Sequence, residues 1–271
     1  MPAAKGTALA AAGALTVKGR APKTGYSRDQ FGQAWYDADR NGCDTRNDIL
    51  RRDLKNFTLK AGTNGCLVLR GTLTDPYTAA TLKFIRGSST SSAVQIDHVV
   101  ALSDAWQKGA QQLSTSRRTA FANDPLNLLA VDGPTNAAKG AGDAATWLPR
   151  TKTYRCAYVA RQVAVKARYA LWVTPSERDA IVRILQGCPT QKLPSSKAVP
   201  LGGGTVETVT PPKKASPPTP APEPAKPSSK VDLQFDTCKA AKAAGYGPYY
   251  SGKDAEYDWY RDADSDGIVC E

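Results

Sequence analysis

Five polar residues in the middle of the chain have the types and spacing that phosphodiester hydrolysis requires. His98, the only histidine of the 271 residues, directly follows Asp97 at the end of a β-branched segment. Asn127 follows 29 positions later, and Asn136 and Lys139 lie in the segment PTNAAKG. Histidine can deprotonate water, because its ordinary pKa near 6.5 leaves it mostly neutral at pH 7. Asp97 and Asn136 supply the hard oxygen ligands that Mg²⁺, Mn²⁺ or Ca²⁺ prefer, and such an ion stabilises the charge on a departing oxygen.

The segments around these residues predict the elements that would position them. The run AVQIDHVV predicts a strand that ends near His98, and NLLAV predicts a second strand. A turn at residues 132–134 and the start of a helix follow it. Strand, loop, strand and helix form a ββα arrangement that would gather the polar side chains at one place.

Each of these residues also has a purely structural interpretation. An Asp-His dipeptide alone is weak evidence, because a lone histidine more often caps an element or packs in a core. The ordered set D-H, N-L and N-x-x-K with ββα spacing favours a catalytic site instead. Asn127 would stabilise a turn in either case, and Lys139 either binds a phosphate or lies on a solvated helix face. Arg46, in CDTRND, either contacts a phosphate or forms a structural salt bridge.

The surrounding sequence predicts a mixture of short strands and amphipathic helices. It is typical of one α+β domain over residues 26–188. Helical patterns cover residues 27–40, 45–57, 103–122, 154–173 and 175–188, and a further strand is predicted at residues 66–73.

The segments QIDHVVAL and NDPLNLLAVDGPTNAAKG resemble the HNH, or His-Me finger, nucleases. The resemblance is closest to the secreted branch that shares its domain with the C-terminal part of GmrSD-type restriction enzymes, and it extends to NGCDTRNDILRRDL, DPYT and DAATWLP. It implies a ββα-metal core with surrounding helices, in which His98 is the general base and Asp97 and Asn136 ligate one Mg²⁺ or Mn²⁺. It also implies that Asn127 positions the catalytic loop, and Lys139 matches a lysine of the relatives. Many members have histidine where this chain has Asn136, and without flanking cysteine pairs no structural zinc is expected.

Six cysteines, at positions 43, 66, 156, 188, 238 and 270, indicate an oxidising compartment. None forms the C-x-x-C spacing of zinc or redox sites, so disulfides are the better interpretation. Six cysteines allow 15 pairings, of which the sequential one is the simplest. Residues 1–25 are expected to be an export remnant or a disordered segment. No stretch approaches the ~20 apolar residues of a membrane span, and we expect a secreted or cell-surface protein.

The amino-acid composition changes twice beyond residue 188. Residues 189–231 contain eleven of the 19 prolines and no aromatic side chain, which predicts an extended linker. Residues 232–271 regain aromatic residues and hold the last two cysteines. A module of that size needs a covalent or metal staple to be stable.

The end of the chain carries a calcium-type motif. Asp262, Asp264 and Asp266 precede a glycine as in the first half of an EF-hand loop, although Glu271 stands at position 10 where an EF-hand has its glutamate at position 12. The segment resembles the Excalibur module, an extracellular calcium-binding domain of bacteria. That resemblance implies Ca²⁺ bound by these four acidic residues, and a Cys238–Cys270 disulfide.

The charge distribution favours a polyanionic partner. The formal net charge is +11, with the excess of Lys and Arg in residues 1–188, whereas residues 231–271 are acidic. We therefore expect a monomeric, extracellular, metal-dependent endonuclease that hydrolyses DNA, with RNA as a further substrate. The alternative is a non-catalytic surface protein that binds DNA or an anionic wall polymer and uses the calcium module for attachment. The joint presence of Asp97, His98 and Asn136 favours the enzyme.

Overall fold

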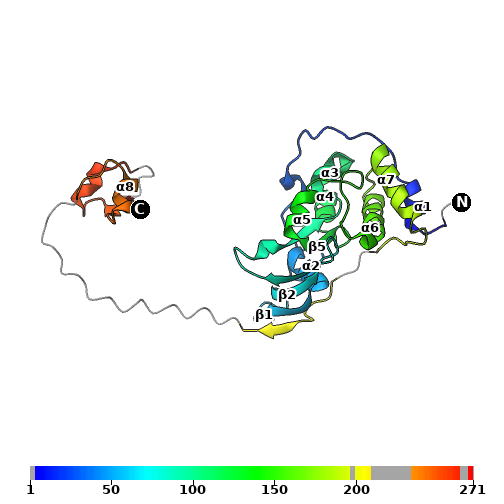
Figure 1. Cartoon of the computed structure of the whole chain (residues 1–271), viewed down its shortest axis with the longest axis horizontal. Coiled ribbons are helices and arrows are strands. Elements are labelled where there is room, and N and C mark those ends of the chain that lie inside the picture. Colours follow the sequence, from blue (N-terminus) through cyan, green and yellow to red (C-terminus); the bar gives the residue numbers. More distant parts are fainter. Residues whose placement is uncertain (1–3, 196–198, 209–232, 263–267, 271) are drawn as a thin grey trace. The chain divides into compact units, whose positions relative to one another are not determined.

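The computed structural model describes residues 4–195, 199–208, 233–262 and 268–270. The chain divides into two compact units, Met1–Val209 and Thr210–Glu271 (Figure 1). The helices are α1 (Ala8–Gly13), α2 (Thr45–Asp53), α3 (Leu102–Trp106), α4 (Thr115–Ala122), α5 (Gly133–Lys139), α6 (Arg155–Arg168), α7 (Pro175–Gln186) and α8 (Cys238–Ala243). The strands are β1 (Lys55–Lys60), β2 (Val68–Thr74), β3 (Thr81–Ile85), β4 (Val94–His98), β5 (Leu128–Asp132), β6 (Thr205–Glu207), β7 (Tyr249–Tyr250) and β8 (Ile268–Val269). Within the described residues, none of the helices has the length and apolar character needed to cross a bilayer.

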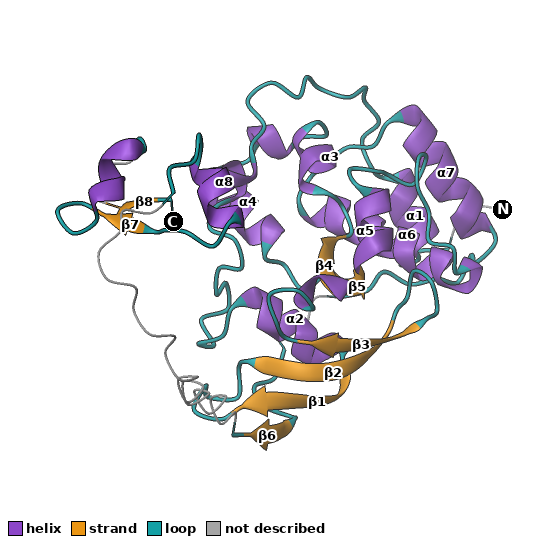
Figure 2. Ribbon diagram, turned by 60° about the vertical axis from the view of Figure 1, so that its left-hand side comes forward, coloured by secondary structure: helices purple, strands orange, loops and turns teal. Residues whose placement is uncertain are grey.

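The first unit has a four-stranded sheet in the order β3-β2-β1-β6 (Figure 2). β1, β2 and β3 are antiparallel neighbours, and β6 adds to the free edge of β1 in parallel. The inner face buries Leu59, Val68, Leu73 and Phe84 against apolar side chains of α2. With these helices and strands together, the predicted mixed α+β class is confirmed.

A second, two-stranded sheet pairs β4 with β5 and forms the centre of the unit. Its antiparallel register places Ile96 opposite Ala130 and His98 opposite Leu128. Alternate β5 residues pack on opposite sides, because Leu128 and Ala130 join the core under the large sheet while Leu129 and Val131 join the core of α1, α6 and α7. Burial on both faces explains the continuous apolar run in this strand. The end of β4, which carries His98, is therefore held in a rigid setting.

Helix α5 begins at once after β5. The Asp132 carboxylate accepts hydrogen bonds from the backbone N–H of Thr135 at 2.8 Å and from its hydroxyl at 2.6 Å, and Pro134 occupies the first turn. This cap fixes the phase of the helix, which packs against both β4 and β5. As a consequence, Asn136 and Lys139 lie one turn apart beside β4.

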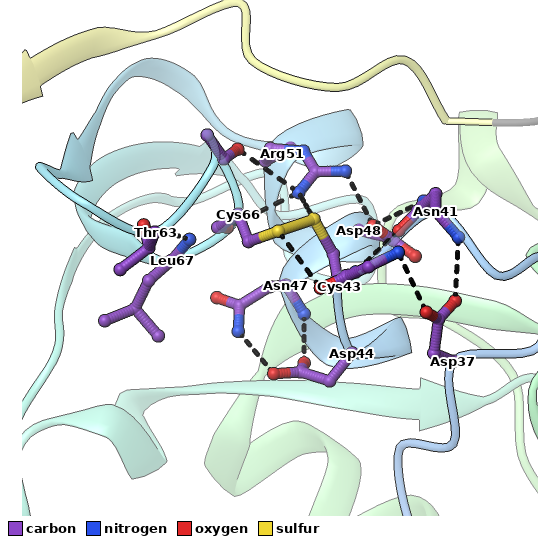
Figure 3. The surroundings of a disulfide bond; sticks show 12 residues. Asp37, Asn41, Cys43, Asp44, Asn47, Asp48, Arg51, Thr63, Cys66 and Leu67 are labelled. Carbon is purple, nitrogen blue, oxygen red and sulfur yellow. Dashed lines mark hydrogen bonds and ion pairs between the residues drawn. A yellow bond between two sulfur atoms is a disulfide. The ribbon is translucent and has the colours of Figure 1, made fainter.

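The expected sequential disulfides are the ones observed: Cys43–Cys66, Cys156–Cys188 and Cys238–Cys270. The first joins Cys43, two positions before α2, to Cys66, two positions before β2 (Figure 3). Beside it, Arg51 forms a buried ion pair with Asp48 at 2.6 Å, and it donates to the Cys43 sulfur at 2.9 Å. The disulfide thus links the chain at the start of α2 to the chain at the start of β2, the strand that α2 covers.

The structure departs from three of the predicted helices. The helix predicted over residues 45–57 ends at Asp53, and residues 55–57 belong to β1. Residues 27–40 contain only the 3₁₀ turn η1 (Arg28–Phe31) and then an irregular loop. Residues 103–122 break into α3, a 3₁₀ turn and α4. The break falls at Gly109, whose φ of +118° suits glycine, and a Cβ there would lie 3.0 Å from the Trp172 ring. Tertiary packing of Trp172 therefore overrides the local helical pattern.

The boundaries of the first unit also differ from those expected. Residues 4–25 belong to the domain, because Ala8 and Ala12 of α1 pack on α6 and α7 and the Lys18 N–H donates to the Val173 carbonyl at 3.0 Å. Residues 205–207, expected in the linker, form β6 in the sheet. Neither segment has an apolar periodicity of its own, and both are held by backbone hydrogen bonds with the body of the unit.

A buried ionic cluster fastens the N-terminal segment to α3, α6 and α7. The Lys108 ammonium lies 2.7 Å from an oxygen of each of three carboxylates, and Arg20 reaches two of the same carboxylates at 2.6 and 2.9 Å. Burial alone would raise the pKa values of Asp104 and Asp143, but the surrounding cations hold both below the ordinary value. Equal numbers of opposite charges make the burial tolerable. The members are Arg20, Asp104, Lys108, Asp143, Lys166 and Glu177.

The second unit is small and aromatic. Its described part contains α8, capped by the Thr237 side chain, the two-stranded pairing of β7 with β8, and the 3₁₀ turn η5 (Ala255–Trp259). Tyr249 and Val269 are buried beside the Cys238–Cys270 disulfide, and Tyr249 stacks on Tyr260 with ring centroids 5.9 Å apart. A covalent staple thus supplements a core of only a few side chains.

Candidate active site

His98 is held with one ring nitrogen blocked. Its Nε2 lies 2.8 Å from the carbonyl oxygen of Ala122. Because a carbonyl only accepts, Nε2 must carry the hydrogen and Nδ1 keeps the basic lone pair. Burial lowers the pKa of His98 to about 4, against a smaller opposing effect of the Ala122 hydrogen bond. The imidazole is therefore neutral at pH 7, in the form that a general base needs.

Asp97 is buried and held by two donors. The Tyr77 hydroxyl donates to Oδ2 at 2.5 Å, and the Lys139 ammonium donates to Oδ1 at 2.9 Å. Lys139 also donates to the backbone carbonyl of His98 at 2.9 Å. Burial, and then the Asp97 charge, raise the pKa of Tyr77 well above its usual value, so this phenol remains a donor. Both carboxylate oxygens keep a further lone pair for a cation.

Asn136 faces the same cavity as Asp97 and His98, which has a volume of about 380 Å³. Its Nδ2 donates to Oε1 of Gln95 at 2.8 Å, which directs the amide and leaves Oδ1 as the acceptor. The exposed cations Lys23 and Arg28 line this cavity too. A carboxylate and an amide oxygen beside one cavity are suitable ligands for Mg²⁺ or Mn²⁺.

Asn127 ties the loop that follows His98. Its fully buried side chain accepts from the Val100 N–H at 2.8 Å and donates to the Val100 carbonyl at 3.3 Å. Its own carbonyl accepts from the Val99 N–H at 2.8 Å. These bonds pin both residues after His98 to the start of β5.

Two side chains expected to meet phosphate are used within the fold. Lys139 is buried, and its ammonium is paired with Asp97, so it lies neither in solvent nor on the cavity surface. Arg46 donates to the carbonyls of Ser91 and Val94 at 3.3 and 3.2 Å, and burial lowers its pKa. Arg46 therefore anchors the entry into β4.

Sequence reasoning missed Tyr77, Gln95, Lys23 and Arg28. A signal existed for Gln95, because it precedes Asp97 by two positions and a strand places such residues on one face. Tyr77 lies in the segment DPYT that carries part of the family resemblance, but nothing local indicated that it reaches Asp97 from the connection between β2 and β3. Lys23 and Arg28 lie in a segment without regular strands or long helices.

The calcium residues of the tail are described only in part. The Tyr257 hydroxyl donates to Oδ2 of Asp262 at 2.6 Å. Asp264, Asp266 and Glu271 lie outside the described residues. The predicted calcium ligands therefore remain a prediction at the level of single residues.

The sequence of the loop before α2, WYDADRNG at residues 35–42, is similar to the tail motif WYRDADSDG at residues 259–267. Here the Asp37 carboxylate accepts from the N–H groups of Asn41 and Gly42 at 3.1 and 2.9 Å (Figure 3). The Asn41 amide donates to Asp39 and Asp48 at 3.1 and 3.2 Å. These carboxylates thus close the turn, and nowhere in the described residues do three acidic, His or Cys side chains converge as metal ligands.

Residues 44–184, more than half of the chain, match the family described as GmrSD restriction endonucleases, C-terminal domain. The chain belongs to this family. The GmrSD C-terminal domain match runs from the residue before α2 into α7 and includes all five polar residues around His98. Residues 235–271 match the Excalibur calcium-binding domain. The resemblances to the GmrSD C-terminal domain and to the Excalibur module are confirmed.

A relative from Arthroderma benhamiae, named "Uncharacterized secreted protein", is 38% identical over 184 residues, which cover 67% of this chain and 85% of that protein. No solved structure matches the chain.

Proposed function

We propose that the first unit is a metal-dependent endonuclease that hydrolyses phosphodiester bonds of nucleic acid, with His98 as general base. The observation that carries the proposal is the cavity shared by His98, Asp97 and Asn136. It combines a neutral imidazole whose free nitrogen is Nδ1 with two hard oxygen ligands. Membership of a family of restriction endonuclease domains supports the same class of reaction.

The residues of the chain divide the work as follows. His98 accepts a proton from water at Nδ1, while the Ala122 carbonyl fixes the ring through Nε2. Asp97 and the Oδ1 of Asn136 would hold one Mg²⁺ or Mn²⁺. When bound, such an ion supplies charge stabilisation at the phosphate and the departing oxygen. This ββα-metal assignment is supported by the order β4, β5 and α5, in which β4 carries Asp97 and His98 and α5 carries Asn136.

The supporting residues keep this arrangement in register. Tyr77 and Lys139 orient the Asp97 carboxylate, and Gln95 orients the Asn136 amide. We assign the contact with substrate phosphate to Lys23 and Arg28, in place of Lys139 and Arg46, because the first two are exposed at the cavity. Partners of such cations are polyanions, in agreement with the basic charge of the chain.

We also propose that the second unit binds Ca²⁺ and that the whole chain is secreted. The Excalibur match supports calcium binding. Three disulfides support folding in an oxidising compartment, as does a relative named as a secreted protein. The two compact units support a nuclease module and a separate calcium module.

The test is hydrolysis of plasmid DNA and of a single-stranded oligonucleotide by the purified, oxidised full-length chain. We expect cleavage with Mg²⁺ or Mn²⁺ and none after EDTA treatment, with recovery when the metal is restored in excess. Binding without cleavage under every metal condition would favour the alternative, a surface protein that only attaches to DNA or wall polymer.

A further inference from the structure

A second cavity lies on the other side of His98. Its lining includes Phe31, Ala34 and Trp35, and it shares Arg28 and His98 with the cavity that holds Asp97 and Asn136. About 90 Å³ is open to the centres of water molecules, several times the roughly 10–15 Å³ that one water needs. The proposed general base therefore stands between a polar compartment and an aromatic one.

The wall of the aromatic cavity is held in a fixed conformation. Phe31, at the end of η1, is buried against Trp106 and Phe121. The next residue, Gly32, has a φ of +79°, and a Cβ there would meet the Thr119 hydroxyl at 2.4 Å. Trp35 has a φ of +58°, a conformation that bulky residues rarely adopt and that tends to occur at functional sites. The cavity is thus preformed by the loop that replaces the expected helix.

The cavity is also lined by the side chain of Asn123, which has an available hydrogen-bond acceptor. Asn123 is 2% exposed, and its Nδ2 donates to the Thr119 carbonyl at 2.9 Å. Among the described residues, no hydrogen bond to its Oδ1 is found, although Asn123 lines the cavity. An acceptor that lines a cavity without a protein donor can bind water or a ligand there.

We propose that this aromatic cavity binds one unpaired nucleobase next to the scissile phosphate, so that the site prefers single-stranded to duplex nucleic acid. The proposal rests on the nuclease function proposed above. Aromatic side chains stack on any base, and Arg28 at the junction is suited to the adjacent phosphate. Asn123 Oδ1 would accept from an amino or imino group at the base edge. A base stacked and paired within a duplex cannot enter such a cavity.

The test uses a variant that fills the cavity and removes no existing contact. Ala34→Phe places a ring in the space of the base, and Ala38→Phe, four positions along the same loop and outside this cavity, is the matched control. Both changes are made in the full-length chain and binding is measured in EDTA, so that no cleavage occurs and His98, which lines this cavity, is kept. The probes are a fluorescent single-stranded oligonucleotide and a duplex of the same length at one salt concentration.

We expect Ala34→Phe to weaken single-strand binding about tenfold and leave duplex binding and the Ala38→Phe control unchanged. Tenfold corresponds to ~1.4 kcal/mol, within the range for one stacked base. Equal loss for both probes, or no loss, would overturn the base cavity. If single-strand binding behaves as expected but the wild-type chain never cleaves, the nuclease proposal fails and the base cavity stands. If the wild type cleaves and Ala34→Phe binds the single strand and the duplex as the wild type does, the base cavity fails and the nuclease proposal stands.

Discussion

Replacement of Tyr77 by phenylalanine removes one oxygen from a fully buried side chain and no carbon contact. The lost interaction is the 2.5 Å hydrogen bond to Oδ2 of Asp97. Hydrogen bonds to charged groups contribute about 1.5–3 kcal/mol to stability, and we expect the free energy of unfolding to fall by that amount. Loss of the donor also frees the carboxylate to rotate. Outer hydrogen bonds of this kind typically change metal affinity or activity by about 10–100-fold, so the Mg²⁺ concentration for half-maximal cleavage should rise by a factor in that range.

The assay is a Mg²⁺ titration of oligonucleotide hydrolysis together with urea unfolding of the same preparations. Tyr158→Phe is the matched control, because Tyr158 is equally buried and its hydroxyl bonds to Gln162, 3.1 Å away, and not to Asp97. The control should lose stability without a change in the metal requirement. An unchanged Mg²⁺ midpoint in Tyr77→Phe, or the same rise in Tyr158→Phe, would refute the positioning role of Tyr77.

Three further predictions concern stability. Lys108→Met should lower the free energy of unfolding by about 3–5 kcal/mol in urea, because it leaves buried carboxylates uncompensated; a loss below about 1 kcal/mol would contradict this. Asp104 and Asp143 have lower pKa values in the folded than in the unfolded chain. Their contribution to the free energy of unfolding is therefore present above about pH 4 and is lost as the pH falls through the folded values. The same free energy of unfolding at pH 6 and pH 3 would rule this out. A chain that ends at residue 208 should melt at a higher temperature than one that ends at residue 204, because only the first keeps β6 on the edge of β1. Equal melting temperatures would show that β6 adds nothing.

The sequence predicted the elements that have strong local signals. α2, α6 and α7 follow apolar periodicity. β4, β5 and α5 follow a β-branched run, a second apolar run and a turn. The sequence left 15 disulfide pairings open, and the simplest of them, in which each pair lies within one segment, is the one observed. These helices and strands depend on residues near one another in the chain, which is why a single sequence was sufficient.

The rest depends on contacts between distant residues. Arg20 binds carboxylates 84 and 123 positions away, so residues 4–25 looked dispensable until those partners were placed. Lys139 could be a solvated lysine or a phosphate ligand by its spacing, and its buried pairing with Asp97 across 42 positions was not visible. Tyr77 likewise reaches Asp97 from 20 positions away, with no periodicity to indicate it.

The most direct test of the central claim is single-turnover cleavage by His98→Ala. The measurement compares the full-length variant with wild type at saturating Mg²⁺, with circular dichroism and the melting temperature confirming that both are folded. Ser103→Ala, which alters the same cavity without touching the proposed base or ligands, is the control. A general base typically contributes about 10²–10⁴-fold, so the rate of His98→Ala should fall by that factor while Ser103→Ala stays near wild type. A folded His98→Ala protein that cleaves at the wild-type rate would contradict the assignment of His98 as the base.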